Sequence, residues 1–368
     1  MLTSRQLVEY LLEQKLLDPS LIIAGELKIL DVSRRNSAFK VISPQSSYVV
    51  KQGNTQDSIS TVAHEAAVYQ LLLSEREGDT SSFSEYIPLF YRYDPSERVL
   101  ILELLSDAED VRQYHTRRYR FPKSLGASMG KALGTLHSSA RLTDECCREP
   151  FPKQVPWALS IHRPQLGIFK EVSAANLQLI RVIQQSTEFC RLLDGLRKNW
   201  HADRLIHRDI RLDNWIIFSQ SSSRRKVGLK LVDWEFAAKG DPCWDVGSVF
   251  SGYLSFWLSS MPITGREKPE RFLELSRYPL ERMQPALRSF WTSYCKRTGL
   301  DGPIADQWLL RAIRYAAVRL VQTAFEQTTR AKGLSGNIIG LLQLSLNMLS
   351  RTHEAARLLL GLPLEHGY

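Results

Sequence analysis

The sequence contains few cysteines and no apolar run long enough to cross a membrane. Five of its 368 residues are cysteine, and none of them forms a C-x-x-C pair. An odd number without such pairs argues against a disulfide framework or a zinc site and favours a reducing compartment. The apolar stretch at 337–350 is too short for a membrane span and carries polar side chains. Because residues 1–17 form a charged amphipathic pattern and not a signal peptide, we expect a cytoplasmic protein without a membrane segment.

The charge balance is basic, whereas the overall composition is that of an ordinary globular protein. The chain carries 48 Lys and Arg against 39 Asp and Glu, a net charge of +9, and 43% of its residues are hydrophobic. This charge suits anionic partners such as nucleotides, nucleic acid or a membrane surface, and it is equally found on well-solvated surfaces. The length favours two domains or lobes over one core.

The first part of the chain reads as a small sheet with helices. Residues 3–18 and 57–75 have helical periodicity. Alternating and β-branched segments predict antiparallel strands at 26–32, 36–42, 46–52, 87–93 and 98–105.

Beyond residue 105 the pattern becomes helical, over 123–140, 172–199 and most of 243–362. The only clear strands there are 214–218 and 226–232, joined by a Ser/Arg-rich hairpin tip. We therefore predict an α+β fold with two lobes: a small antiparallel β N-lobe over residues 1–105, and a larger, mainly α C-lobe over 106–368. A ligand is expected in the cleft between such lobes.

The segment "LIHRDIRLDNWIIF", residues 205–218, interrupts an apolar run with charged and amide side chains. Asn214 precedes one strand of the predicted hairpin and Asp233 follows the other, so the two lie close together. An amide oxygen and a carboxylate are suitable Mg²⁺ ligands beside substrate phosphates. Asp209, five residues before Asn214, is then placed to accept a proton from an attacking hydroxyl, with Arg211 adding positive charge.

These motifs resemble the aminoglycoside phosphotransferase and choline kinase-like family, which shares the protein-kinase fold. "HRDIRLDN" resembles its catalytic loop, and "LVDWEFAAKGDPCWDVG" resembles its metal-binding segment. The resemblance implies an ATP- and Mg²⁺-dependent kinase in which Asp209 is the catalytic base and Asn214 and Asp233 hold the metal. It also implies that His207 and Asp245 support the catalytic loop.

The N-lobe contains matching positions for nucleotide binding. By the same resemblance, Lys51 in "YVVK" contacts the α- and β-phosphates, and Glu65 in "HEAAVYQLL" is its ion-pair partner. "LILELL" matches the hinge, where backbone groups of Glu103 and Leu105 meet adenine. Taken alone, a strand lysine and a helical glutamate are more often solvated surface residues.

The sequence departs from protein kinases in its phosphate-covering loop, because residues 27–42 contain no glycine. A Ser/Asn turn replaces the glycine-rich loop in the small-molecule branch, so Ser33, Asn36 and Ser37 are the candidates for this role. Arg34 and Arg35 either help to hold phosphate or are simply solvated.

Three other interpretations compete with a kinase. "GASMG" satisfies the G-x-S-x-G pattern of a serine hydrolase with Ser128 as nucleophile, but small residues at a helix–helix contact explain it better. The basic, tyrosine-rich segment 112–120 suits nucleic acid or a solvated surface, and we expect no nucleic-acid partner. The third alternative is a pseudokinase that binds nucleotide and a partner protein without chemistry.

The acceptor is expected to be a hydroxyl-bearing small molecule or a Ser/Thr of a precursor peptide, as the resemblance implies. The aromatic stripe that follows Asp233 offers Tyr253 and Trp257 as candidates for the acceptor wall, because both rings have polar tips. The alternative is that this stripe belongs to the core.

Overall fold

The computed structural model describes residues 2–33, 37–53, 61–73, 83–105, 107–139, 151, 153–164, 172–219, 227–262 and 275–364. The chain divides into two compact units, the first comprising residues 1–111 with 213–237, and the second comprising 112–212 with 238–368. Among the described residues, no helix has the length and apolarity needed to cross a membrane.

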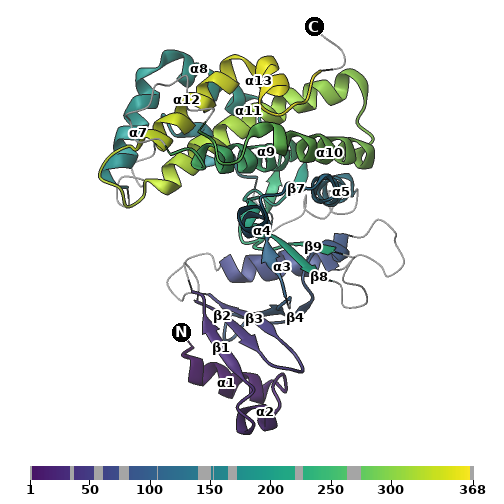
Figure 1. Cartoon of the computed structure of the whole chain (residues 1–368). Helices are drawn as coiled ribbons and strands as arrows, with labels where there is room; N and C mark the ends of the chain where they lie inside the picture. The colour runs from purple at the N-terminus through teal and green to yellow at the C-terminus, as the bar shows by residue number, and fades with distance from the viewer. Residues whose placement is uncertain are drawn as a thin grey trace. The chain divides into compact units, whose positions relative to one another are not determined.

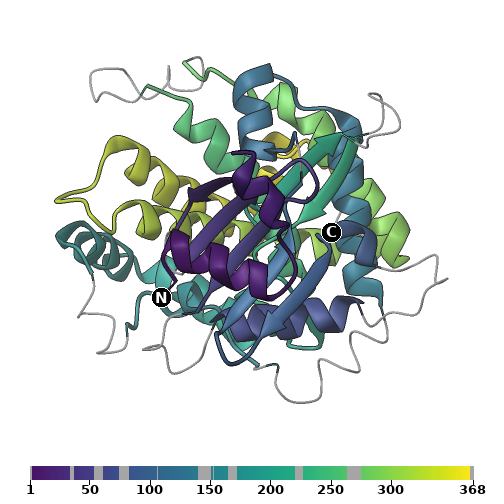
Figure 2. The same cartoon turned by 90° about the horizontal axis from the view of Figure 1, so that it is seen from below.

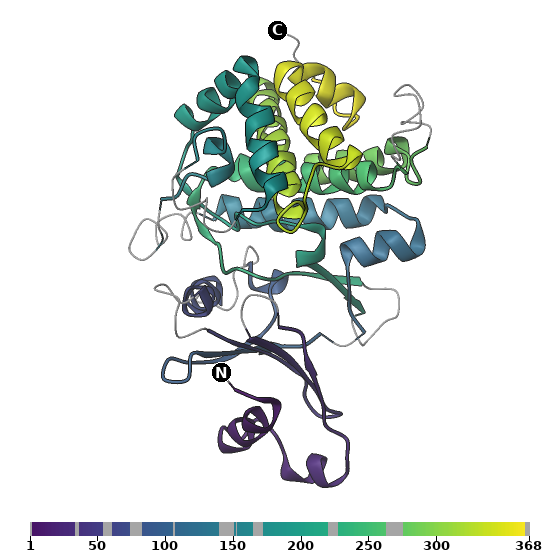
Figure 3. The ribbon, with the colours of Figure 1, turned by 90° about the vertical axis from the view of Figure 1, so that its left-hand side faces the viewer.

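The first unit is built on a five-stranded antiparallel sheet in the order β1-β2-β3-β5-β4. The strands are β1 (Lys28–Asp31), β2 (Ser37–Ile42), β3 (Tyr48–Gln52), β4 (Phe90–Asp94) and β5 (Val99–Glu103). Helix α3 (Thr61–Leu73) covers one face of this sheet, and α1 (Ser4–Glu13) with α2 (Pro19–Ile23) covers the other (Figures 1 and 3). The predicted strands and α3 are present. The prediction of one continuous helix over residues 3–18 was wrong, because α1 ends at Glu13.

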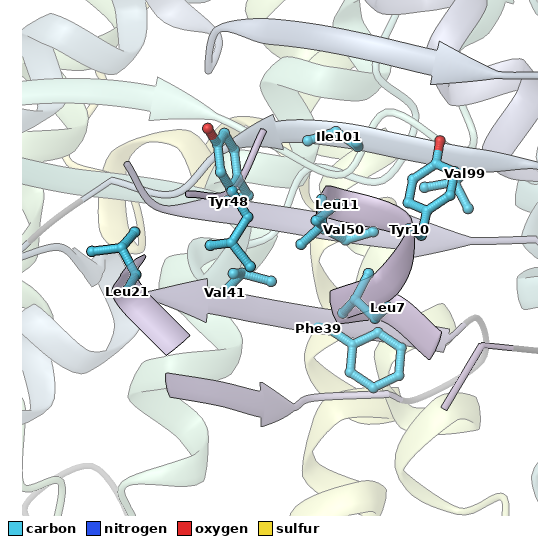
Figure 4. Close-up of a cluster of buried hydrophobic side chains, with 11 residues drawn as sticks. Leu7, Tyr10, Leu11, Leu21, Phe39, Val41, Tyr48, Val50, Val99 and Ile101 are labelled. Carbon is cyan, nitrogen blue, oxygen red and sulfur yellow. The ribbon is translucent and has the colours of Figure 1, made fainter. Parts of the chain in front are cut away.

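Helices α1 and α2 form a hydrophobic core with the outer face of the sheet. Viewed from this side, the two helices cross over the strands (Figure 2). The cluster consists of Leu7, Tyr10, Leu11, Leu17, Leu21, Phe39, Val41, Tyr48, Val50, Val99 and Ile101, most of which are labelled in Figure 4. Alternate residues of β2 and β3 point into it, as expected for strands with one apolar face. The Tyr10 hydroxyl also donates to Asp94 Oδ2 at 3.0 Å, which ties α1 to β4.

Residues 213–237 group with the first unit because their hairpin pairs with it. In this hairpin β8 (Trp215–Ser219) pairs with β9 (Val227–Leu231) and with the short strand β6 (Glu109–Asp110). Lys230 Nζ also donates to the Ile87 carbonyl oxygen at 2.8 Å. The structure thus divides the chain differently from the single boundary at residue 105 that the sequence suggests.

The second unit is mainly helical, as predicted. Its longer helices are α4 (Val111–Arg118), α5 (Lys123–Ser138), α7 (Ala174–Gln185), α8 (Thr187–Lys198), α9 (Pro242–Ser259), α10 (Leu280–Thr298), α11 (Gly302–Gln327) and α12 (Gly336–Ser350), followed by the short α13 (Thr352–Leu358). Helix α5 packs against α10, and α11 packs against α9 and α12. A two-stranded antiparallel sheet of β7 (Arg204–Ile206) and β10 (Ala238–Gly240) was not predicted. Three-residue strands have too little pattern to be recognised in a sequence.

Candidate active site

Lys51 lies between two carboxylates in the first unit. Its Nζ donates to both carboxylate oxygens of Glu65, at 2.9 and 2.8 Å, and to Asp233 Oδ1 at 2.8 Å. Burial lowers the pKa of Lys51, but the two negative charges outweigh this effect and hold the pKa above its usual value. The ammonium group is therefore charged at neutral pH, which the predicted role in phosphate binding requires. The structure brings the predicted pair together and adds Asp233 to it.

Three elements position this group of charges. Lys51 is on β3 and Glu65 is on α3, while Asp233 follows the end of β9. The Glu65 side chain is only 1% exposed, and its Oε1 also accepts a hydrogen bond from the Trp234 backbone N–H at 3.2 Å. Glu65 thus connects the strand lysine to the backbone beside Asp233.

Asn214 and Asp233 lie at the same end of the β8–β9 hairpin. The Asn214 carbonyl oxygen accepts from the Val232 N–H at 3.0 Å, directly before Asp233. Asp233 has a side chain 39% exposed, so its carboxylate is accessible. An amide and a carboxylate oxygen beside bound phosphates fit the chemistry of Mg²⁺, which takes few protein ligands. Among the described residues there is no cluster of three or more His, Cys, Asp or Glu that could hold a metal unaided.

Asp209 lies in the loop after β7, in the second unit, and is ion-paired. Its Oδ1 accepts a hydrogen bond from Arg319 Nη2 at 3.0 Å, and the Arg319 side chain is only 5% exposed. The same Nη2 lies 3.4 Å from the Ile210 carbonyl oxygen. Arg319 comes from α11, and sequence reasoning missed it. The available signal was a lone arginine in the apolar run "AAVRLV", because a buried charge is almost always paired.

Asp245 holds the backbone of the loop that follows β7, the predicted catalytic loop. Its side chain is fully buried, and it accepts hydrogen bonds from the backbone N–H groups of His207, at 2.7 Å, and Arg208, at 2.9 Å. The Arg208 carbonyl oxygen accepts from Trp244 Nε1 at 2.9 Å. These are the contacts that a bracing acid would make, and His207 itself is buried beside Asp209.

The other predicted residues are less tightly organised. Arg211 is half-exposed and pairs with Glu326 at 3.5 Å. The Ser33 hydroxyl accepts from the Ala38 backbone N–H at 3.0 Å across the β1–β2 turn. Ser37 begins β2, and Asn36, like Arg34 and Arg35, lies outside the described residues.

The predicted hinge residues lie at the end of β5. The Glu103 N–H donates to the Leu89 carbonyl oxygen at 2.9 Å, so this donor is already used within the sheet. Leu105 is partly buried.

The proposed acceptor-wall residues are both buried. Tyr253 is 1% exposed and Trp257 is 5% exposed. The Tyr253 hydroxyl lies 3.3 Å from His115 Nε2, inside the second unit. This packing favours the core interpretation of the aromatic stripe.

The serine hydrolase interpretation is wrong. Ser128 lies within α5, and no strand enters a turn before it. A Cβ atom at Gly126 or Gly130 would clash with the backbone carbonyl oxygen of Ala286 or Phe290 on α10. The two glycines therefore serve the close approach of α5 and α10, and the motif match is incidental.

Comparisons with known structures identify the fold. The ethanolamine kinase of Plasmodium vivax superposes with a TM-score of 0.54 at 13% identity, over 95% of this chain and 89% of its own. The choline kinase LicA of Streptococcus pneumoniae gives 0.52 at 14% identity, over 93% and 99%. LicA in complex with AMP gives 0.50 at 14% identity, over 93% and 97%. At such low identities these superpositions establish the kinase-like fold alone, which confirms the predicted fold class.

The family is established by sequence. No curated protein matches the chain. The model that describes the phosphotransferase enzyme family matches residues 26–272, which is well over half of the chain. This range includes the candidate site residues described above except Arg319. The chain therefore belongs to the phosphotransferase enzyme family.

Proposed function

We propose that the protein transfers the γ-phosphate of ATP to a hydroxyl group of a small molecule. The observation that carries this proposal is the contact of Lys51 with both Glu65 and Asp233, which places a charged ammonium group beside a candidate metal ligand. The complex of the similar LicA with AMP supports an adenine nucleotide. The similar choline and ethanolamine kinases support a small hydroxyl-bearing acceptor.

Each half of the chemistry has its own residues. Lys51 binds the α- and β-phosphates, and Glu65 keeps its ammonium group in position. Asn214 and Asp233 would hold Mg²⁺, which when bound supplies positive charge against the transferring phosphoryl oxygens. Asp209 accepts the proton of the acceptor hydroxyl.

The proposed base has a permanent cationic neighbour. Arg319 holds one carboxylate oxygen of Asp209 at 3.0 Å. This ion pair keeps the carboxylate in a single orientation, as a positioned base requires. Arg319 is thus a positioning residue.

The test is ATP consumption with a panel of amino alcohols, sugars, aminoglycosides and peptides, followed by Asp209→Asn. With the acceptor found, this variant should lose about two or more orders of magnitude in turnover while its affinity for nucleotide stays within about a few-fold. Asp203→Asn, which removes an exposed carboxylate before the same loop, is the matched control and should keep full turnover. Undiminished turnover of Asp209→Asn would exclude Asp209 as the base. A protein that binds nucleotide but phosphorylates no acceptor would favour the pseudokinase alternative.

A further inference from the structure

A cavity of about 490 Å³ opens between α8 and α11 in the second unit. Figure 3 shows α8 (teal) beside α11 and α12 (green to yellow), and Leu349 of α12 contributes to the cavity wall. Its volume lies in the range of small-molecule sites. None of its lining residues belongs to the Lys51 group or to the catalytic loop.

The charged side chains that line this cavity are all arginines. Arg191, Arg311 and Arg314 line it, and no Asp or Glu is among its lining residues. Arg314 Nε donates to the neutral Thr352 hydroxyl at 3.4 Å. Within the described part of the chain, neither Arg191 nor Arg314 has an ion pair at all. Guanidinium groups without counter-charges attract an anion, and they bind carboxylate or phosphate oxygens in pairs.

One of the arginines is held in place by its surroundings. Arg311 Nη1 lies 3.6 Å from Asp241 Oδ2, and its guanidinium carbon lies 5.3 Å from the centre of the Trp308 ring. The Tyr315 hydroxyl donates to the same Asp241 oxygen at 3.2 Å. The part of the wall around Arg311 is thus preorganised, which reduces the entropy lost when a ligand binds.

The remaining lining is mostly apolar or amide. Leu192, Leu196 and Leu349 provide an apolar surface, and Asn199 and Gln307 provide amide donors near the arginines. A ligand that fits this combination has an anionic head and an apolar body.

We propose that this cavity is a binding site for a small phosphomonoester, with the phosphate on Arg191 and Arg314 and the apolar body on the leucines. Phosphate is favoured over carboxylate because it carries up to two charges and three strong acceptor oxygens, to which both Arg191 and Arg314 can donate charge-assisted hydrogen bonds. The site is separate from the proposed phosphotransfer chemistry, so its occupancy does not depend on that activity.

The test is calorimetric titration of the full chain with phenyl phosphate, in the presence of saturating ADP and Mg²⁺ to fill the proposed nucleotide site. Arg191→Gln/Arg314→Gln should weaken binding by about tenfold or more, the effect of losing charge-assisted hydrogen bonds. Arg181→Gln/Arg282→Gln removes the same charge from exposed positions outside the cavity, and it should bind like the wild type.

A second variant blocks the cavity without removing an arginine. A side chain at Gly195, which lines the cavity, would meet nothing within 4 Å of its Cβ atom. Gly195→Glu should therefore fold normally, pair with the arginines and abolish phenyl phosphate binding.

Three results would overturn the proposal: no binding by the wild type, equal binding by the wild type and both cavity variants, or benzoate binding as tightly as phenyl phosphate. The last result would assign the site to carboxylates. Failure of the proposed phosphotransfer would appear in the ATP-consumption assay and would leave these titrations unaffected.

Discussion

Two charged residues of the candidate site have a left-handed backbone. Arg208 has φ 70° and Asp233 has φ 72°, a region that residues other than Gly, Asn and Asp seldom adopt. Such a conformation costs about 1–3 kcal/mol and persists only where the surroundings enforce it. For Arg208 the enforcement is visible, since Asp245 accepts from its N–H and Trp244 Nε1 donates to its carbonyl oxygen. For Asp233 the side chain is held by Lys51.

At the residue scale, the Asp209–Arg319 ion pair should be strongly coupled. Arg319→Met removes the arginine that donates to a carboxylate only 15% exposed, and breaking a buried pair costs about 3–5 kcal/mol. In an Asp209→Ala background, Arg319→Met should lower the free energy of unfolding by less. The difference between the two effects, roughly 1–3 kcal/mol, is the interaction energy of the pair. Urea denaturation of the four proteins in this double-mutant cycle measures the difference.

The chain contains a matched control for this cycle. Arg5 and Glu9 form an ion pair at 3.2 Å on α1, with side chains 90% and 58% exposed. Exposed pairs contribute little to stability, so the equivalent cycle with Arg5→Met and Glu9→Ala should give a coupling near zero. Equal coupling energies in the two pairs would contradict the prediction that the buried Asp209–Arg319 pair is coupled more strongly than an exposed pair.

A further residue-scale prediction concerns the metal. Asp233→Ala should abolish the gain in ADP affinity that Mg²⁺ provides, and Asn214→Ala should reduce it less, because a neutral amide attracts the cation more weakly than a carboxylate does. Calorimetry with and without Mg²⁺ measures this gain. If both variants keep the metal dependence of the wild type, these two residues do not hold the metal.

At the scale of elements, the close contact between α5 and α10 depends on glycines of α5, which have no side chain. Gly130→Ala would drive a Cβ atom into the Phe290 carbonyl oxygen, and overpacking of this kind costs about 1–3 kcal/mol. This cost opposes the gain in stability of about 1 kcal/mol that replacing glycine by alanine brings to a helix interior. We therefore expect a lower melting temperature for this variant.

Gly195→Ala on α8 is the matched control, because its Cβ would have nothing within 4 Å. Here only the helix propensity acts, so the melting temperature should rise. A rise at both positions would show that α5 and α10 can separate without loss of stability.

Elements with a strong pattern were predictable, and their ends were not. The region 172–199, predicted to be helical, contains two helices, α7 and α8, and the Ser186 hydroxyl caps α8 by accepting from the Phe189 N–H at 3.2 Å. The helix expected over 3–18 ends at Glu13, and α2 starts anew with Pro19 in its first turn and Asp18 as its cap. Serine, aspartate and proline are compatible with either arrangement, and tertiary packing decides between them.

At the scale of the whole molecule, linear motifs identified the candidate site residues, whereas contacts between distant segments could not be predicted from such motifs. Lys51, Glu65 and Asp233 could be named because each sits in a short motif with a fixed order along the chain. Arg319 lies 110 residues beyond Asp209, in a helix whose hydrophobic periodicity indicates only an apolar face. A pairing of this separation is set by the packing of the second unit.

The acid stability of the whole molecule should depend on one buried histidine. His115 is fully buried, with Nδ1 2.7 Å from the Arg120 carbonyl oxygen and Nε2 3.3 Å from the Tyr253 hydroxyl. Burial lowers its pKa from 6.5 to about 4, although the hydrogen bond to Arg120 partly opposes this. Between these two pH values the unfolded chain binds a proton that the folded chain does not bind. Folding is therefore destabilised progressively as the pH falls from about 6.5 to 4.

His115→Gln should remove this part of the pH dependence, since glutamine can donate to the Arg120 carbonyl oxygen but does not titrate. On acidification from pH 6.5 to 4.5, the free energy of unfolding of the variant should fall by about 2 kcal/mol less than that of the wild type, because one pKa unit corresponds to about 1.4 kcal/mol. This difference does not depend on the stability of the variant at pH 7. Urea denaturation at a series of pH values measures the two slopes. His353→Gln, at an exposed position of α13, is the control and should follow the wild-type curve. Parallel curves for His115→Gln and the wild type would mean that His115 takes up its proton inside the folded protein, and the acid sensitivity would then have to come from other groups.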